Sequence, residues 1–381
     1  MKKYTILLSI IFMLFGQGSR QLDSLALVAL YNATNGVNWS DPWDFTQGID
    51  TFSGVTLSSG RVTSVKLSSR GLNGSIPDSI RYLTEITNLW LQSNDLGGAI
   101  PAAIGNLNKL TSLRLYGNQL NGSIPPELGD LANLTLLWLY DNQLSGSIPP
   151  ELGNLTKLTS LKLSSNQLNG AVPDELSTVT SLNILELQNN QLSDIGDFSF
   201  LGTLKLDQNN FEFDDLEPNL AIGSFTYSLQ ANIGEEETVY VDKGETARLH
   251  LDVGGSANTY QWFKGGVAIS GATTDSLILS SVQESDGADY ILTVSSTTVP
   301  SLTLNSFPIH LQISLGRQAD SLVLVQLYNL LGGENWKKSW DFNKVLDSLE
   351  GVEIVNNRVS SLYLIDFNLS GPIPAELGQL D

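Results

Sequence analysis

Aromatic and cationic side chains recur at a fixed spacing in the first half of the chain and carry its most distinctive potential chemistry. One series runs Lys66, Trp90, Arg114, Trp138 and Lys162, and Tyr116 and Tyr140 follow two residues after Arg114 and Trp138. Tryptophan, tyrosine and arginine dominate binding energy in interfaces, whereas cations and indoles about 5 Å apart also attract each other by ~0.5–1 kcal/mol. The pattern leaves two alternatives open: a recognition surface for an anionic or polar ligand, or side chains that only stack on one another.

Catalytic and metal-binding patterns are scarce. The chain has no cysteine, and its only histidines, His250 and His310, sit between apolar neighbours on expected strands. The stretch DQNNFEFDD from Asp207 to Asp215 loosely resembles a calcium loop, but Phe211 occupies a ligand position and the required glycine is missing. No glycine pattern joins a strand to a helix as a phosphate loop would, and the carboxylates are scattered over repeat loops and linkers without a defined pair. We therefore expect no enzyme, no metal site and no cofactor.

An internal repeat of 24 residues positions the two series. Alternating leucines such as Leu137 and Leu139 indicate a short strand whose leucines point inward while the residues between them face outward. An asparagine follows each strand, and its amide is expected to satisfy backbone groups that the turn would otherwise bury unpaired. These structural asparagines are Asn94, Asn118, Asn142, Asn166 and Asn190.

The repeat frame LxxLxLxxNxLxGxIPxxLGxL resembles the plant-type leucine-rich repeat over residues 62–211. The resemblance implies a mainly β solenoid with short 3-10 or helical segments, in which each repeat buries its leucines against its neighbours. Related arrays bind peptides or small molecules on the inner, concave face, which here would present Lys66, Trp90, Arg114, Tyr116, Trp138, Tyr140 and Lys162 as ligand-binding residues. The GxIP half is lost after Asp194, so the array is predicted to end near Phe211.

Short alternating strands follow an acidic linker predicted at residues 212–226. Residues 227–314 resemble an immunoglobulin-like β-sandwich, because Trp262 lies in the third-strand sequence YQWFK and Tyr290 lies in ESDGADYIL, which matches the D-x-G-x-Y corner of that family. Both aromatic residues are expected to be structural. Leu251 and Leu292 stand where that family usually has its disulfide cysteines.

One module occurs twice, at an offset of 297 residues and without a gap. Its first copy, residues 19–61, directly precedes the repeats, where an exposed apolar end needs a cover. The stretch LDSLALVALYNAT has helical spacing, and Trp39 and Trp43 are expected to close the resulting N-terminal cap. Similar caps of plant receptors are held by cysteines, so tryptophans would take that role here.

The second copy of the module spans residues 318–358 and carries Trp336 and Trp340 as the matching structural tryptophans. Residues 359–381 then supply the start of a second array, a single repeat. Because about three repeats are needed to bury a continuous core, we expect this chain to be a fragment of a longer protein.

Residues 1–18 read as a signal peptide: two lysines, an apolar run and small residues suited to cleavage. Nothing later in the sequence resembles a membrane span, so we expect no transmembrane helix in the mature chain. A net charge of −20 argues against nucleic acid, which needs a basic footprint. The expected location is outside the cell, secreted or on the cell surface.

These features predict a non-enzymatic recognition protein whose concave solenoid face binds a protein, a peptide or a carbohydrate. The mixed modules and the absence of cysteine resemble bacterial secreted or surface proteins. Two alternatives stay open: a structural adhesin whose modules act as rigid spacers, and the ectodomain of a receptor whose signalling part lies outside this chain. Fold alone does not choose among them.

Overall fold

The computed structural model describes residues 19–314, 316–338, 340–342, 348–355, 358–373, 377 and 380. The signal peptide predicted for residues 1–18 lies outside this set. The chain divides into two compact units: the described residues up to Ala231 with Gly254–Ala257 and Thr298–Leu302, and the remainder from Asn232 onward. In the described part, none of the helices combines the length and apolar character that a membrane span requires.

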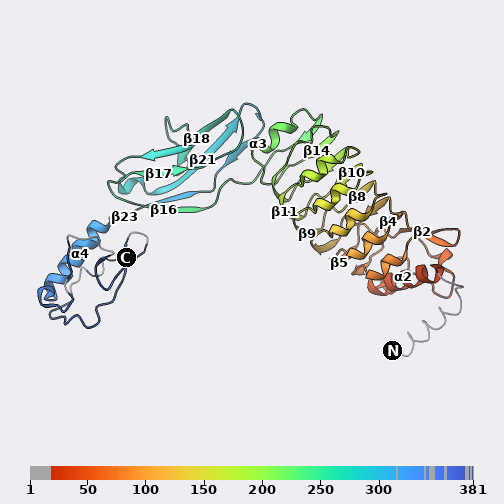
Figure 1. Ribbon diagram of the computed structural model, residues 1–381, viewed down its shortest axis with the longest axis horizontal. Helices are drawn as coiled ribbons and strands as arrows, with labels where there is room; N and C mark the ends of the chain where they lie inside the picture. Colours follow the sequence, from red (N-terminus) through yellow and green to blue (C-terminus); the bar gives the residue numbers. More distant parts are fainter. Residues whose placement is uncertain are drawn as a thin grey trace. The chain divides into compact units, whose positions relative to one another are not determined.

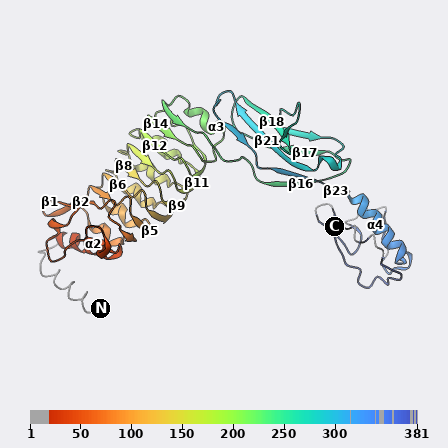
Figure 2. The same ribbon diagram turned by 180° about the vertical axis from the view of Figure 1, so that it is seen from behind.

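The first unit is a solenoid built on two sheets that follow its length (Figures 1 and 2). The larger sheet has the order β1-β2-β4-β6-β8-β10-β12-β14-β15, and all its pairs from β2 onward are parallel. Its strands are β1 (Val55–Ser58), β2 (Arg61–Lys66), β4 (Asn88–Trp90), β6 (Ser112–Arg114), β8 (Leu136–Trp138), β10 (Ser160–Lys162), β12 (Ile184–Glu186), β14 (Thr203–Lys205) and β15 (Ser224–Thr226). The predicted mainly β solenoid is confirmed.

Each turn of the solenoid returns through a second parallel sheet and a short 3-10 helix. The second sheet contains β3 (Asn73–Gly74), β5 (Asp95–Ala99), β7 (Gln119–Gly122), β9 (Gln143–Gly146), β11 (Gln167–Ala171) and β13 (Gln191–Asp194). The 3-10 helices are η3 (Asp78–Tyr82), η4 (Ala102–Asn106), η5 (Pro126–Asp130), η6 (Pro150–Asn154) and η7 (Asp174–Thr178). Proline opens η5 and η6, where its fixed φ suits a first helical position and its missing N–H costs nothing.

The core of the solenoid is a column of leucines. The two strand leucines of each turn, such as Leu113 and Leu115 or Leu137 and Leu139, are fully buried. Burying a leucine side chain contributes about 1.5–3 kcal/mol, and each turn obtains this contribution only from its neighbours.

The helical N-terminal cap predicted for the solenoid is confirmed. Helix α2 (Ser19–Ala33) buries Ala26, Leu27 and Leu30. It is followed by η1 (Gly36–Asn38), η2 (Ile49–Thr51) and the antiparallel pair β1 and β2. The strands that follow all run parallel, so the cap closes one edge of the sheet with a hairpin.

Residues 212–226, predicted as a linker, instead form a further turn of the solenoid. Helix α3 (Phe213–Leu216) and η8 (Glu217–Asn219) lead into β15, which pairs in parallel with β14. Phe213 and Leu216 are fully buried. Likewise, the array does not end at Phe211, because the larger sheet continues to β15, which ends at Thr226. This turn departs from the repeat consensus, which is why its sequence resembles a linker.

Asp215 makes the stability of this last turn depend on pH. Its carboxylate accepts a hydrogen bond from the Glu212 backbone N–H (2.8 Å) at the start of α3, and burial raises its pKa to about 7. The pKa of an unfolded aspartate is about 4, so the folded form binds the extra proton between these values and loses stability as pH rises from about 4 to 7.

We expect Asp215→Asn to unfold at a higher temperature than the wild type at pH 8, because the amide still accepts the Glu212 bond without a buried charge. At pH 4.5 the difference should shrink or reverse. Thermal melts of both proteins across this pH range test the expectation, with the exposed Asp130→Asn as the matched control. If the melting temperatures of the wild type and Asp215→Asn changed equally with pH, the expectation would be contradicted.

Residues 237–314 form two sheets. One has the order β16-β23-β21-β18-β19 with β22 beside β21, and the other pairs β17 with β20. The strands are β16 (Glu237–Asp242), β17 (Ala247–His250), β18 (Asn258–Lys264), β19 (Val267–Ala268), β20 (Ser276–Leu279), β21 (Ala288–Ser296), β22 (Thr303–Asn305) and β23 (Ile309–Ser314), with η9 (Glu284–Asp286) before β21.

Two predicted structural residues lie in the core of this segment. Trp262 is fully buried and its indole N–H donates to the Thr274 carbonyl (2.9 Å). Tyr290 is fully buried, and its hydroxyl donates to the Asp286 carbonyl (2.9 Å). Leu292 is buried as well, but Leu251 lies beyond the end of β17, and Leu249 is the β17 leucine that enters the core.

The second copy of the module contains α4 (Gly316–Leu330), η10 (Gly333–Asn335), β24 (Val352–Val355) and β25 (Arg358–Leu362). Strands β24 and β25 pair antiparallel, as β1 and β2 do. Leu324, Leu327, Trp336, Trp340 and Phe367 belong to one buried cluster. The helix and hairpin of the first copy are thus repeated in the second.

Candidate binding surface

The predicted ligand-binding residues lie at equivalent positions of successive parallel strands. Lys66, Trp90, Arg114, Trp138 and Lys162 are consecutive backbone partners in the register of β2, β4, β6, β8 and β10. Neighbouring strands are about 4.8 Å apart, so these five side chains form one row. We call this row the cation–indole stripe.

Within the cation–indole stripe, each indole lies between two cations. The Lys66 Nζ is 4.0 Å from the centre of the Trp90 ring, and the Arg114 guanidinium carbon is 4.1 Å from that centre. Arg114 is also 4.3 Å from the Trp138 ring, and the Lys162 Nζ is 5.2 Å from it. The guanidinium of Arg114 is therefore held between two indoles, which orients it and limits its rotation.

Two serines fix the orientation of the indoles. The Trp90 Nε1 donates to the Ser112 hydroxyl and the Trp138 Nε1 donates to the Ser160 hydroxyl, each at 3.0 Å. Both indole N–H groups are thereby satisfied by the neighbouring strand. These serines were not singled out from the sequence, although both lie two residues before a cation of the stripe.

Glu186 ends the stripe with an ion-pair network. Its carboxylate lies 3.2 Å from the Lys162 Nζ and 3.0 Å from the Lys205 Nζ. Burial alone would raise the pKa of Glu186, but hydrogen bonds from Lys205 and Lys162 outweigh it and hold that pKa below its usual range. The positive charge of Lys162 is thus largely neutralised by Glu186.

The other two stripe cations lack such compensation. Among the described residues, neither Lys66 nor Arg114 has an acidic partner within ion-pair distance. The Nε–H of Arg114 is buried and has no hydrogen-bond acceptor in the described part of the chain. A guanidinium with unused donors in a protein of net charge −20 is a local exception that favours an anionic group.

The two predicted tyrosines lie beside the stripe and stack on each other. The rings of Tyr116 and Tyr140 are 4.3 Å apart and nearly parallel, at 9°. Burial, followed by the proximity of Tyr116, raises the pKa of Tyr140 to about 12. Tyr140 therefore stays neutral at physiological pH. Tyr116 also lies 6.2 Å from the Trp138 ring, which joins the pair to the stripe.

The predicted structural asparagines stabilise the turns beneath this surface through hydrogen bonds from their side chains to the backbone. The Asn142 amide donates to the carbonyls of Leu115 (3.1 Å) and Leu139 (3.0 Å), and its oxygen accepts from the Leu120 N–H (3.1 Å). Asn94, Asn118, Asn166 and Asn190 make the same bonds in their own turns. The ladder continues through Asn209, and Gln230 takes the same role in the last turn by donating to the Leu206 carbonyl (3.0 Å).

The repeat geometry agrees with a known family. Residues 109–131, 133–155 and 157–179 match the family model described as Leucine Rich Repeat. These three turns are leucine-rich repeats. Three of the five residues of the cation–indole stripe, Arg114, Trp138 and Lys162, lie within them, so the candidate surface is part of a leucine-rich-repeat sheet.

Several solved structures are similar to this chain. A plant ice-binding protein is 29% identical, with 55% of this chain and 69% of that chain covered and a TM-score of 0.48. A chain of the BIR3–SERK2 complex from Arabidopsis thaliana is 36% identical over 45% of this chain and 94% of that chain (TM-score 0.39). The SOBIR1 ectodomain from the same plant is 28% identical over 44% and 93% (TM-score 0.38). No curated protein matches the chain.

The cap tryptophans of the leucine-rich-repeat unit are structural in their placement. Trp39 and Trp43 are 3% and 5% exposed, and their rings are 5.0 Å apart in an edge-to-face arrangement. Trp336 and Trp340 of the second copy are each 6% exposed and 5.1 Å apart. All four indole N–H groups donate to backbone carbonyls. These rings are therefore not available as a platform for sugars.

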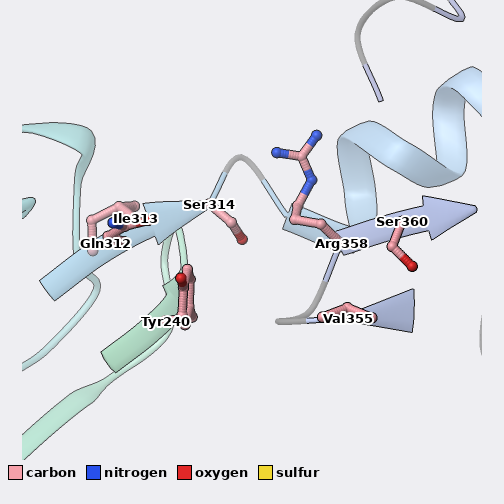
Figure 3. Close-up of a pocket in the computed structure, with 7 residues that line it drawn as sticks. All are labelled: Tyr240, Gln312, Ile313, Ser314, Val355, Arg358 and Ser360. Carbon is pink, nitrogen blue, oxygen red and sulfur yellow. The ribbon is translucent and has the colours of Figure 1, made fainter. Parts of the chain in front are cut away.

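Outside the leucine-rich repeats lies a pocket of about 370 Å³. Figure 3 shows the residues that line it: Tyr240, Gln312, Ile313, Ser314, Val355, Arg358 and Ser360. Arg358 is its charged lining residue, and it already pairs with Asp320 (2.9 Å). The lining residues include no acid–base pair or nucleophile beside a base. Across the described residues, no group of three or more histidine, aspartate or glutamate side chains could hold a metal ion.

Proposed function

We propose that this chain belongs to a non-enzymatic recognition protein that acts outside the cell and binds an acidic peptide segment on the concave face of its leucine-rich-repeat sheet. The observation that carries the proposal is Arg114: its guanidinium is clamped between Trp90 and Trp138 and has no acidic partner in the described part of the chain. A guanidinium held in one orientation is suited to bidentate recognition of a carboxylate, and little side-chain entropy remains to be lost on binding.

The stacking also favours one kind of ligand over another. Each indole of the cation–indole stripe has a cation 4.0–5.2 Å from its ring centre on both sides. A sugar ring would have to displace a cation before it could stack on Trp90 or Trp138. An extended peptide with carboxylates instead uses the cations as they stand, and its backbone can lie across the parallel strands.

The proposal is tested by titrating the protein with octaglutamate and following tryptophan fluorescence, with octaglutamine and the neutral sugar cellohexaose as comparison probes. We expect saturable binding of octaglutamate only, weakened by salt because the contacts are electrostatic. Arg114→Gln should weaken it by about tenfold or more, since a hydrogen bond to a charged group contributes about 1.5–3 kcal/mol.

Lys157→Gln is the matched control, because Lys157 is an exposed cation of the same array that bonds Asn133 and lies outside the stripe. It removes the same charge and should leave binding unchanged. Equal weakening by both variants would reduce the effect to net charge and contradict the proposal. Preferential binding of cellohexaose would contradict the peptide as ligand.

A structural adhesin or rigid spacer is the second candidate. It is favoured by the continuous stacking of the stripe and by Glu186, which closes one end of it with ion pairs. In that case Trp90→Ala and Trp138→Ala would lower the melting temperature, and no probe would bind saturably. A receptor ectodomain would use the same surface, and its signalling part stays a prediction.

A further inference from the structure

A shallow hollow lies in the second sheet of the solenoid, where β3, β5 and β7 pair with one another. Its volume is about 410 Å³, which is within the range of small-ligand sites. The lining consists of glycines and polar side chains alone: Asn73, Gly74, Ser75, Asp95, Gly97, Gly98 and Gln119. No residue of the cation–indole stripe lines it, so the hollow is separate from the surface proposed for an acidic peptide.

The register of the second sheet brings the polar side chains of the hollow together. Asn73 on β3 is the direct backbone partner of Asp95 on β5, and Gly97 on β5 is the partner of Gln119 on β7. Leu96 is fully buried, so Asp95 and Gly97 on either side of it face outward. Neighbouring strands are about 4.8 Å apart, and the outward side chains of all three strands therefore meet at one place.

Two departures from the repeat consensus shape the hollow. The position of Asp95 holds glutamine in the four following turns, and the position of Gly97 holds asparagine or serine in the same turns. These residues are Gln119, Gln143, Gln167 and Gln191, and Asn121, Ser145, Asn169 and Ser193. Both departures fall on one face of β5, two residues apart. They introduce a carboxylate and remove a side chain at the same point of the sheet.

The fold does not require the glycine at position 97. Gly74 and Gly98 have φ values of 129° and 74°, a region that favours glycine, whereas the φ of Gly97 lies outside it. A Cβ on Gly97 would meet only the Gln119 carbonyl oxygen, at 3.9 Å, which is an ordinary contact. A side chain would thus fit the backbone but occupy the hollow. Glycine inside a strand often marks a place where a ligand approaches the backbone closely.

The Asp95 carboxylate is available to a ligand. Among the described residues, no lysine or arginine lies within ion-pair distance of it. The Gln119 amide donates a long hydrogen bond to one of its oxygens (3.4 Å). An ionised carboxylate can accept about four hydrogen bonds, and the amides of Asn73 and Gln119 carry both donors and acceptors. The hollow therefore combines one strong acceptor with neutral polar groups.

We propose that this hollow binds a neutral saccharide, with two adjacent hydroxyls of one sugar ring donating to Asp95 and the amides of Asn73 and Gln119 bonding the hydroxyls beside them. The absence of a side chain at Gly97 lets the ring approach the strand.

Other ligand classes fit this lining less well. An anion would face the Asp95 carboxylate in a protein of net charge −20, and no cation lines the hollow to offset it. An apolar ligand would leave the polar groups of the lining unpaired. An amine could pair with Asp95 but would leave the amides on either side without a role.

The inference is tested by titrating the isotope-labelled full chain with xylohexaose, mannohexaose and maltohexaose, one at a time, and following backbone amide shifts by NMR. We expect at least one of these neutral sugars to shift the amides of Gly97, Gly98 and Gln119 saturably, without changing the tryptophan fluorescence of the stripe. Hexalysine serves as the cationic probe. Shifts of these amides by hexalysine alone, or by none of the four probes, would overturn the proposal.

A matched pair of variants locates the binding. Gly97→Asn places the consensus side chain in the hollow and should weaken sugar binding at least tenfold. Ser145→Asn makes the same residue at the equivalent position of β9 and should leave binding unchanged. Asp95→Gln, which restores the consensus residue, should weaken binding by about tenfold, because hydrogen bonds to a charged acceptor are the stronger ones. Undiminished binding by Gly97→Asn, or equal weakening by both asparagine variants, would place the sugar elsewhere and refute the site.

Discussion

Replacing Asn142 by alanine is expected to lower the free energy of unfolding of the solenoid by about 3 kcal/mol, because buried backbone groups that lose a partner cost about 1–3 kcal/mol each. Asn142 lies in the middle of the ladder, where its amide reaches three carbonyls and its oxygen accepts from the Leu120 N–H. The alanine side chain can replace none of these bonds, which lie beside the fully buried Leu139 and Leu144.

The matched control for this change is Asn121→Ala in the preceding turn. Asn121 is exposed and takes part in β7 through its backbone, so its loss should change stability by less than about 0.5 kcal/mol. Urea unfolding followed by circular dichroism measures both variants. A loss for Asn142→Ala as small as that for Asn121→Ala would show that the amide ladder contributes little to the solenoid.

The cation–indole stripe could be anticipated from the sequence because the repeat period transmits register. Residues 24 apart become direct partners on parallel strands, so the order of Lys66, Trp90 and Arg114 along the chain is also their order in space. The same register places Glu186, 24 residues after Lys162, beside it on the next strand. Of the stripe cations, only Lys162 therefore has a glutamate as a partner. The hydrogen bonds of the two indoles to Ser112 and Ser160 could not be anticipated, because they depend on side-chain conformation.

The last turn of the solenoid shows where repeat matching fails. Its ladder residue is Gln230, whose side chain is one methylene longer than asparagine but still reaches the Leu206 and Tyr227 carbonyls. Its core has phenylalanines at Phe211 and Phe213 beside Leu216. Both replacements keep the physical role while changing the residue type, so consensus matching missed the turn. A search for buried amides and apolar spacing, without fixed residue types, would have found it.

Residues 237–314 show a similar limit. The burial of Trp262 followed from its strand sequence. Alternation marks both Leu249 and Leu251 as inward, because they differ by one full strand period. The structure buries Leu249 and leaves Leu251 half-buried just beyond the end of β17 at His250, and that strand end is set by long-range pairing with β20.

Replacing Asp23 by alanine is expected to destabilise the N-terminal cap by about 3–5 kcal/mol, because breaking a buried ion pair leaves its partner uncompensated. The Asp23 carboxylate is fully buried and joins three things at once: helix α2, the Arg61 side chain and the Val62 backbone at the start of β2. Without it, Arg61 keeps the Thr84 hydroxyl as a partner but loses its bidentate one. The edge of the leucine-rich-repeat sheet would then open first.

The duplicated module supplies the internal comparison for this change. Asp320→Ala removes the same bonds from the second copy, so each variant should speed amide hydrogen exchange only in its own hairpin: at Val62 for Asp23→Ala and at Val359 for Asp320→Ala. Asp50→Ala, which removes an exposed carboxylate 3.5 Å from Arg20, should change stability by at most about 1 kcal/mol. Faster exchange in both hairpins from one substitution would contradict two independently closed caps, and a loss for Asp23→Ala no larger than that for Asp50→Ala would contradict the role of the buried pair.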